Sequence, residues 1–303
     1  MNAGSLDCFP GKVVLHPESS RSKQGVWMFD FGQNYYPKKI MDHRHLNRRK
    51  YFEEQAQHTL EYIIPYLTPL INFSPQLSVC EIGCGEGGNL KPFLDNGCKV
   101  TGIDISVNKI ENALVFFHQH QRVENLSLFA LDVNKIQPDR TGLFDLIILR
   151  DTLEHLPDHV NTLQHIKSFL KPTGKLFIGF PPWRMPFGGH QQMCKSKVLS
   201  KMPYVHLLPA SLYYSVLHLF GESKEKIEAF REIRDTRISI RKFKKVVRQV
   251  KFTIEAEDYF LINPNYKVKF NLNPRKLPLA MNIPYVRDFY VTTCYFIVGS
   301  NCN

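Results

Sequence analysis

Residues 77–104 read LSVCEIGCGEGGNLKPFLDNGCKVTGID, and this stretch decides the fold. An apolar run of strand length comes first, and four glycines follow it: Gly83, Gly85, Gly87 and Gly88. Glycine lets the backbone approach a ligand closely, and the helix expected from about residue 89 to 94 presents unpaired N–H groups toward the turn. A second apolar run ends at Asp104, about 20 residues after the first glycine, where an acid can accept hydrogen bonds from both hydroxyls of a ribose. The stretch therefore predicts a cofactor that contains a nucleoside.

The glycines fit two kinds of cofactor. Gly83, Gly85 and Gly88 satisfy the G-x-G-x-x-G pattern of NAD-binding proteins. However, Glu81 and Glu86 add negative charge where a dinucleotide would place its pyrophosphate, which is unfavourable for an anion. A sulfonium cofactor has no phosphate and carries a cationic amino group, so nearby acids suit it. An NAD-dependent oxidoreductase is the alternative, and binding of NADH would favour it.

Three motifs resemble those of class I S-adenosylmethionine-dependent methyltransferases, in particular small-molecule enzymes of the type 11/12 kind. Residues 81–87, EIGCGEG, resemble motif I, whose usual form is acid-x-Gly-x-Gly-x-Gly. Residues 130–133, ALDV, resemble the motif in which an acid contacts the adenine amino group and the next backbone N–H contacts the ring. Residues 150–157, RDTLEHLP, resemble the segment after the fourth strand. The resemblance covers roughly residues 77–180.

The resemblance implies S-adenosyl-L-methionine as the cofactor and S-adenosyl-L-homocysteine as the product. It implies methyl transfer to an oxygen, nitrogen or carbon atom of a small acceptor, which the aromatic residues of the later insertion suggest is aromatic or lipid-like. For Asp132, a role as a turn or cap acid after a strand is the alternative to adenine binding. The cofactor-binding residues implied are Glu81, Gly83, Gly85, Gly87, Asp104, Ile105, Asp132, Val133, Arg150 and Asp151.

Strands and helices alternate along the chain, which predicts right-handed crossovers and one largely parallel sheet. Further strands are expected at residues 126–131, 144–149 and 175–180, and two late strands at 252–262 and 290–299. By resemblance, the late strands form a C-terminal antiparallel hairpin. The expected fold is α/β, a Rossmann-like doubly wound sheet of about seven strands with a helical insertion after strand five. Its ligand crevice should lie at the carboxyl ends of the strands.

Four parts are expected along the chain. Residues 1–50 form an N-terminal arm or cap, in which the basic residues 37–50 are expected to be a solvated face. Residues 51–180 form the cofactor-binding core, with a helix expected at residues 51–67 and a turn at residues 171–174. Residues 181–250 form a helical lid or substrate insertion, because this segment leaves the end of the fifth strand and is rich in aromatics. Residues 251–303 supply the strands that complete the sheet.

Methyl transfer to oxygen or nitrogen can require removal of a proton, and histidine has a suitable pKa. His190, which follows two glycines in the insertion, and His155, in the segment after the fourth strand, are the candidate catalytic residues. His206 is a third choice. A histidine hydrogen-bonded within its own loop is the alternative in each case.

The chain has a formal net charge of +11. Residues 222–251 contain 11 Lys and Arg and 5 Asp and Glu, and all the acids lie in the first half of this segment. Acids at the start of a helix and basic residues at its end are favourable for the helix dipole, which explains this order without a ligand. A basic helix face can also bind nucleic acid, so an RNA- or DNA-modifying methyltransferase that uses this helix is an alternative. Nucleic acid is not the favoured partner.

The seven cysteines form no C-x-x-C pair, which indicates reduced structural thiols and no metal site. No secretory signal opens the chain, and a cytoplasmic protein is expected. Residues 202–221 carry no Asp, Glu, Lys or Arg, but prolines interrupt them, so peripheral membrane contact is an alternative and a transmembrane helix is not expected.

Overall fold

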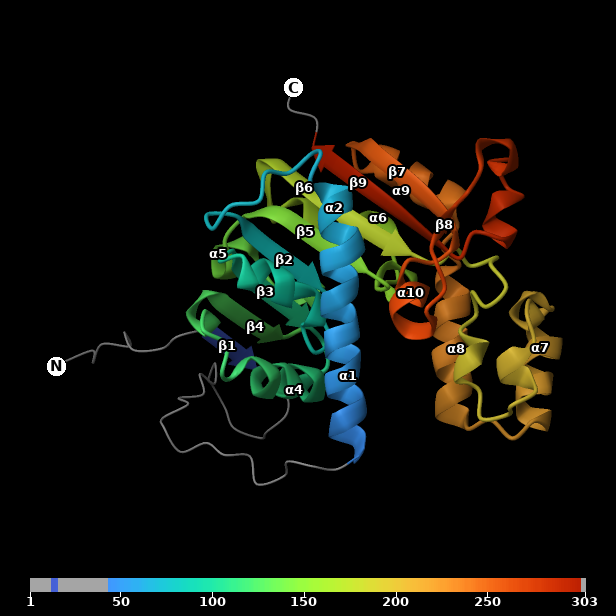
Figure 1. The fold of residues 1–303 in the computed structure, drawn as a ribbon. Coiled ribbons are helices and arrows are strands. Elements are labelled where there is room, and N and C mark those ends of the chain that lie inside the picture. The colour runs from blue at the N-terminus through green and yellow to red at the C-terminus, as the bar shows by residue number, and fades with distance from the viewer. Residues whose placement is uncertain (1–11, 16–42, 301–303) are drawn as a thin grey trace. The chain divides into compact units, whose positions relative to one another are not determined.

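The computed structural model describes residues 12–15 and 43–300, and Figure 1 shows its helices and strands. The chain divides into two compact units. The first contains residues 1–148 and 169–174, and the second contains residues 149–168 and 175–303. Most of the expected arm at residues 1–50, together with Cys8 and Cys302, lies outside the described residues.

Parallel strands form the centre of the first unit. β2 (Ser78–Ile82) lies between β3 (Lys99–Asp104) and the first five residues of β5 (Phe144–Arg150), and β3 pairs on its other side with β4 (Leu126–Ala130). The short strand β1 (Lys12–Leu15) pairs with β4. The residues of β5 from Leu146 onward are buried, as expected for a central parallel strand. Because every pair is parallel, the carboxyl ends of β2, β3 and β4 lie at one edge.

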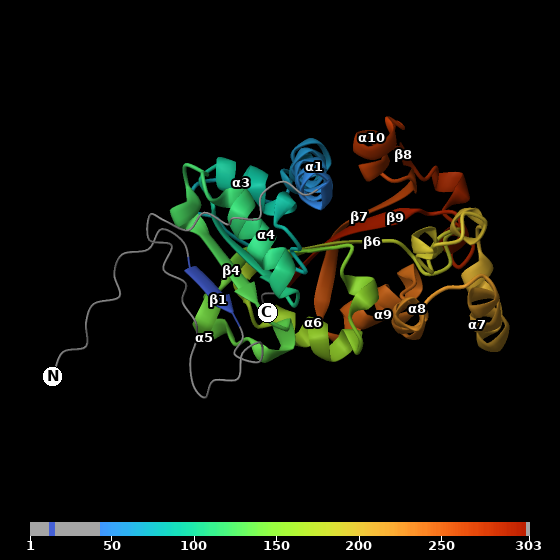
Figure 2. The same cartoon turned by 90° about the horizontal axis from the view of Figure 1, so that it is seen from below.

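Along the described part of the chain, one or two α-helices lie between each strand of the first unit and the next. They are α1 (His43–His58), α2 (Ile64–Leu67), α3 (Lys91–Asp95), α4 (Val107–Phe117) and α5 (Pro138–Thr141). Figure 2 shows α1, α3 and α4 next to one another, and the Phe52 ring of α1 packs 5.2 Å from the Phe117 ring of α4. A π-helical turn at Thr59–Ile63 joins α1 to α2.

The first helix starts earlier than its apolar spacing predicts. The pattern indicated a start near Tyr51, with a solvated basic segment before it, whereas α1 begins at His43. Two ion pairs at the i,i+4 spacing, Arg49–Glu53 and Lys50–Glu54, stabilise this part of the helix. Such pairs extend a helix without adding any apolar residue to the pattern.

Antiparallel strands form the sheet of the second unit. The order is β6 (Leu170–Phe180, of which residues 175–180 belong to this unit), β9 (Thr293–Ser300), β7 (Phe252–Ile262) and β8 (Arg275–Lys276). The helices are α6 (His159–Lys167), α7 (Ala210–Leu219), α8 (Lys224–Thr236), α9 (Ile240–Gln249) and α10 (Asn265–Phe270). Phe243 of α9 packs on the Phe180 and Phe296 rings, at 5.3 and 4.6 Å between centroids.

The expected fold class is confirmed: the early strands are parallel, the C-terminal strands are antiparallel, and helices alternate with the strands. Residues 12–15 and 43–300 contain nine strands, two more than the expected seven or so. The additional strands, β1 and β8, have four and two residues, which is too short for a periodic pattern. Strand β6 begins at Leu170, so the expected turn at residues 171–174 is part of the strand.

The insertion after β6 contains its own apolar cluster. Its buried members include Leu199, Val205, Tyr213 and Leu217, and they pack with Ile227 and Phe230 of α8. Many of the aromatic and apolar residues that suggested an acceptor pocket are therefore core residues of this unit.

Candidate functional site

The glycine turn follows β2 and takes a backbone conformation that only glycine adopts easily. Gly83, Gly85 and Gly87 have φ angles of 75°, 57° and 81°. A Cβ at Gly87 would lie 2.9 Å from the Phe117 ring, so this glycine is needed for packing. A Cβ at Gly85 would meet only the Lys109 side chain, at 3.9 Å. The space beside Gly85 is open to a ligand.

Asp104, at the end of β3, binds the same turn. Its Oδ2 accepts a hydrogen bond from the Gly85 N–H at 2.8 Å, and its Oδ1 accepts one from the Ser106 N–H at 2.8 Å. The Lys109 ammonium lies 3.8 Å from Oδ2. A carboxylate has about four acceptor positions, so two remain beyond these backbone contacts. The glycine turn and Asp104, which the sequence predicts to bind one ligand, are thus in direct contact.

The residues after β3 and β4 take different roles. Ile105, next to Asp104, leaves 74% of its surface exposed, which is unusual for a large aliphatic residue in a packed α/β unit. Asp132 caps the turn after β4: its Oδ1 accepts from the Asn134 N–H at 2.9 Å. This is the capping role that was the expected alternative to adenine binding. The Oδ2 atom of Asp132 takes no part in the contact with Asn134. Val133 is buried.

Glu81 is part of a buried polar relay that sequence analysis missed. Asn89 Nδ2 donates to Glu81 Oε1 at 2.5 Å, and Thr59 Oγ donates to Asn89 Oδ1 at 2.9 Å. All three side chains are buried, and Thr59 opens the π-helical turn after α1. A π-helical turn often marks a functional site, because the extra residue redirects a side chain. A polar Asn directly after the glycines was the available signal.

Glu86, within the turn, has a partner from α1. Arg48 Nη1 lies 2.8 Å from Glu86 Oε1, and the Glu86 side chain is only 2% exposed. The expectation that the basic segment before residue 51 is simply solvated is therefore wrong for Arg48. A buried carboxylate requires such a partner, since an unpaired buried charge is costly.

In the second unit, Arg150 and Asp151 adjoin one another. The Arg150 side chain is buried, and its Nε lies 3.6 Å from Asp151 Oδ2. Asp151 has a φ of 51°, and its N–H donates to the Gly179 carbonyl at 2.8 Å. A positive φ at a residue other than glycine stores strain, and such residues are common at functional sites.

The two candidate catalytic histidines lie together in the second unit. The His155 and His190 rings are 5.3 Å apart in an edge-to-face arrangement. Glu154 lies beside them, and the three residues can each offer one atom within 4.8 Å of the others. His190 also has a positive φ, of 57°. The structure therefore brings together two residues that sequence analysis selected separately, and adds Glu154, which it did not select.

The environment shifts the pKa values of this trio. Burial, and then the neighbouring His155, lower the pKa of His190 to about 4, so its ring is neutral near pH 7. Burial, and then Asp151, raise the pKa of Glu154 well above its usual value. Glu154 Oε2 has no hydrogen-bond partner among the described residues. A neutral imidazole beside a carboxyl group can accept a proton. A neutral imidazole can also bind a divalent metal, so the expected absence of a metal site stays a prediction.

His206 has a structural role. Its Nε2 lies 2.7 Å from the Trp183 carbonyl oxygen, its ring packs edge-to-face on Trp183 at 4.7 Å, and it is fully buried. Gly189 must lack a side chain here, because a Cβ would lie 2.3 Å from the His206 Cβ. The alternative of a histidine held within its loop applies to His206.

Comparison with known proteins defines the family. A family profile described as "Methyltransferase domain" matches residues 43–197, which is just over half of the chain. The chain belongs to this family. The matched segment includes the glycine turn, Asp104, Asp132 and both candidate histidines.

Curated relatives match part of this methyltransferase-domain chain. A ubiquinone biosynthesis O-methyltransferase from Haemophilus ducreyi is 33% identical over 108 residues, which are 33% of this chain and 43% of that protein. The protein of the same name from Histophilus somni is 28% identical over 141 residues, 44% of this chain and 58% of that protein. The chain thus spans about half the length of the curated relatives it matches.

Solved structures share the fold. A putative sarcosine dimethylglycine methyltransferase from Galdieria sulphuraria has a TM-score of 0.52 at 13% identity, covering 80% of this chain and 85% of that one. A chain in the Haloferax volcanii complex between the Trm112 methyltransferase activator and a putative methyltransferase has a TM-score of 0.50 at 15% identity, covering 86% of this chain and 94% of that one. At this identity the likeness shows the fold alone.

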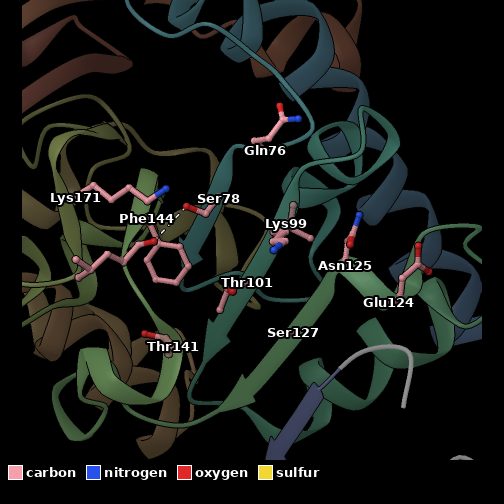
Figure 3. A pocket seen from close by; sticks show the side chains of 12 residues that line it. Gln76, Ser78, Lys99, Thr101, Glu124, Asn125, Ser127, Thr141, Phe144 and Lys171 are labelled. Carbon is pink, nitrogen blue, oxygen red and sulfur yellow. Dashed lines mark hydrogen bonds between the residues drawn. The ribbon is translucent and has the colours of Figure 1, made fainter. Parts of the chain in front are cut away.

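A groove of about 390 Å³ lies elsewhere in the first unit of the methyltransferase-domain chain. Its side chains include Ser78, Lys99 and Ser127, which stand at or near the amino ends of β2, β3 and β4 (Figure 3). The glycine turn and Asp104 lie at the carboxyl ends. In open α/β sheets ligands bind at the carboxyl ends, so this groove is not the cofactor site.

No helix among residues 43–300 combines the length and the apolar character that a bilayer crossing requires. This agrees with the expectation that the uncharged segment at residues 202–221 does not cross a membrane. That segment contains α7, which has only 10 residues.

Proposed function

We propose that this methyltransferase-domain protein is an S-adenosyl-L-methionine-dependent enzyme. It transfers a methyl group to an oxygen, nitrogen or carbon atom of a small acceptor that is aromatic or lipid-like. The observation that carries the proposal is the contact between Asp104 and the Gly85 N–H, beside open space at Gly85. An acid and a bare backbone at one point suit a nucleoside.

Each cofactor residue of the first unit has a separate task. Asp104 accepts hydrogen bonds from the ribose hydroxyls with the acceptor positions that the backbone leaves. The exposed Ile105 side chain covers one face of the adenine, and Asp132 with the Val133 N–H binds its edge. Glu81, held by Asn89, provides negative charge for the cationic amino group. The glycines at 83, 85 and 87 let the backbone approach, and Arg150 and Asp151 are further contacts that we assign by motif.

The bound cofactor supplies an electrophilic methyl group on a sulfonium. The chain has to align the acceptor with that methyl group and exclude water. For an acceptor that must lose a proton, we assign the role of general base to His190, with His155 as its neighbour. His190 is neutral near pH 7 because of its burial, so a lone pair is available to receive the proton. Glu154 lies beside the pair and stabilises the resulting imidazolium in its ionised form, which its burial disfavours.

We also assign the four parts of the chain by role. Residues 51–180 bind the cofactor, residues 181–250 provide the acceptor side, and residues 251–303 complete the sheet. For residues 1–50 we keep the role of an arm or cap, to which residues 12–15 add the edge strand β1. The cysteines of the described residues are free thiols, which supports a reducing compartment, and we propose the cytoplasm.

A nucleic-acid substrate is not favoured. On the basic helix α9, Lys244 is 2.6 Å from Glu257 of β7, and Lys242 donates to the Thr236 carbonyl at 2.5 Å. These contacts use cations that a phosphate backbone would otherwise bind.

Transfer of a labelled methyl group tests the proposed function. The full chain is incubated with S-adenosyl-L-methionine labelled on the methyl group and with phenolic, quinone-like and glycolipid acceptors in parallel. We expect label in one acceptor class, and a loss of transfer in Asp104→Ala. Binding of NADH with no binding of S-adenosyl-L-homocysteine would instead support an oxidoreductase and refute the proposal.

A further inference from the structure

The segment between β8 and β9 exposes large apolar side chains in close succession. Six such residues occur within residues 279–289, and Leu279 has 92% of its surface exposed and Ile283 has 53%. An exposed apolar surface of this kind usually marks a binding site. We call it the apolar strip, and its members are Leu279, Met281, Ile283, Tyr285, Val286 and Phe289.

Hydrogen bonds within the second unit hold the apolar strip in place. Arg287 Nη1 donates to Asn282 Oδ1 at 2.6 Å, and the Arg287 N–H donates to the Ile283 carbonyl at 3.0 Å. The Tyr290 hydroxyl donates to the Met281 carbonyl, and the Tyr204 hydroxyl donates to the Phe289 carbonyl at 2.9 Å. Much of the backbone is thus already hydrogen-bonded, which lowers the cost of moving the strip out of water.

The surroundings of the strip are basic. The sequence has no Asp or Glu from residue 259 to residue 287, and it has five Lys and Arg there, of which Arg287 is buried and Lys276 pairs with Asp258 at 2.6 Å. Asp288 is the acid nearest the strip in sequence; it is buried, and its Oδ2 accepts from the Ile240 N–H at 3.3 Å. Its charge is therefore turned inward, and no exposed side chain of residues 259–287 carries a negative charge.

Two arginines stack on the exposed aromatic rings of the strip. The Arg241 guanidinium lies 4.8 Å from the centre of the Tyr285 ring, and the Arg184 guanidinium lies 5.6 Å from the centre of the Phe289 ring. This combination places positive charge directly beside apolar and aromatic surface. Amphipathic rings and cationic side chains of this kind prefer the boundary between lipid headgroups and acyl chains.

We propose that the apolar strip, with Arg184 and Arg241, docks the protein to an anionic lipid bilayer surface. The apolar side chains enter the headgroup region, and the two arginines bind lipid phosphates. Charge complementarity selects this occupant, because the strip has cations at its aromatic rings and no exposed acid. The proposal does not depend on the methyltransferase function, since docking requires no cofactor and no acceptor.

Flotation with lipid vesicles tests the docking of the full chain. We expect binding to phosphatidylcholine vesicles that contain phosphatidylglycerol, much weaker binding to phosphatidylcholine alone, and weaker binding at high salt. Replacing two apolar residues in Leu279→Ser/Ile283→Ser should lower the partition coefficient roughly 100-fold, since each buried aliphatic side chain contributes about tenfold. Arg241→Gln should lower it about fivefold on anionic vesicles.

Leu219→Ser is the matched control, because Leu219 of α7 is also an exposed leucine, at 82%, but lies outside the strip. Its partition coefficient should stay within about twofold of the wild type. An equal loss in the control and the strip variant, or no binding to anionic vesicles, would overturn the proposal. So would a concentration-dependent dimer that the strip variant abolishes, because the strip would then bind a second copy of the chain.

Discussion

Replacing Asp104 by asparagine tests the proposed cofactor site at the residue on which it depends most. The Asp104 carboxylate accepts one N–H from Gly85 and one from Ser106, each at 2.8 Å. In asparagine one of these positions is an NH₂ group, so one backbone N–H loses its acceptor and faces a donor. The charged acceptor for a ribose hydroxyl is lost as well.

The expected effect on binding follows from these contacts. A hydrogen bond to a charged group contributes about 1.5–3 kcal/mol, so Asp104→Asn should weaken binding of S-adenosyl-L-homocysteine by about 10- to 150-fold. Titration calorimetry on the wild type and the variant measures this. The lost backbone contact should also lower the unfolding midpoint by a few degrees, which differential scanning calorimetry detects.

Asp145→Asn is the matched control. Asp145 Oδ2 accepts from the Ser78 N–H and hydroxyl at 2.8 Å each and from the Lys171 ammonium at 2.7 Å, at the amino end of β5. Its replacement should lower stability to a similar extent and leave the affinity for S-adenosyl-L-homocysteine unchanged. If Asp104→Asn binds within about twofold of the wild type, or if both variants lose affinity equally, the assignment of Asp104 to the ribose is wrong.

Three further results are expected. His190→Ala should lower kcat by about 10²- to 10⁴-fold and keep the affinity for S-adenosyl-L-homocysteine, and an unchanged kcat would exclude His190 as the base. Thr59→Val should weaken cofactor binding about five- to tenfold by removing the donor to Asn89, whereas Thr59→Ser should retain it; equal affinities would limit the relay to a structural role. The pKa of His190 is lowered to about 4 from 6.5, so the unfolded chain binds this proton at higher pH than the folded chain does. Stability from this group is complete above about pH 6.5 and declines as the pH falls toward 4; calorimetry should show a smaller decline in His190→Gln, and an identical decline would contradict the pKa assignment.

Local signals explain what the sequence predicts well. The apolar runs and glycines around residues 77–104 are contiguous, so the β2–turn–β3 unit and the meeting of Asp104 with the turn could be expected from strand pairing. Parallel strands bring their carboxyl ends to one edge, and this rule needs no knowledge of side-chain packing. The antiparallel C-terminal strands followed from the family resemblance.

Contacts between distant segments explain what the sequence did not predict. Arg48 pairs with Glu86, 38 residues away, and Thr59 binds Asn89, 30 residues away. Neither pair leaves a periodic pattern, because each depends on how α1 packs beside the glycine turn. Gly88 shows the closeness of that packing, since a Cβ there would lie 2.4 Å from the Phe52 carbonyl oxygen.

A crystal structure of the chain grown with S-adenosyl-L-homocysteine tests the central claim most directly. The proposed site predicts that both ribose hydroxyls lie within hydrogen-bond distance of the Asp104 carboxylate, with the backbone of Gly85 against the ligand and the adenine beside Ile105. A nucleoside bound away from Asp104, or a crystal in which the ligand occupies another part of the chain, would contradict the cofactor assignment and the proposed enzyme class with it.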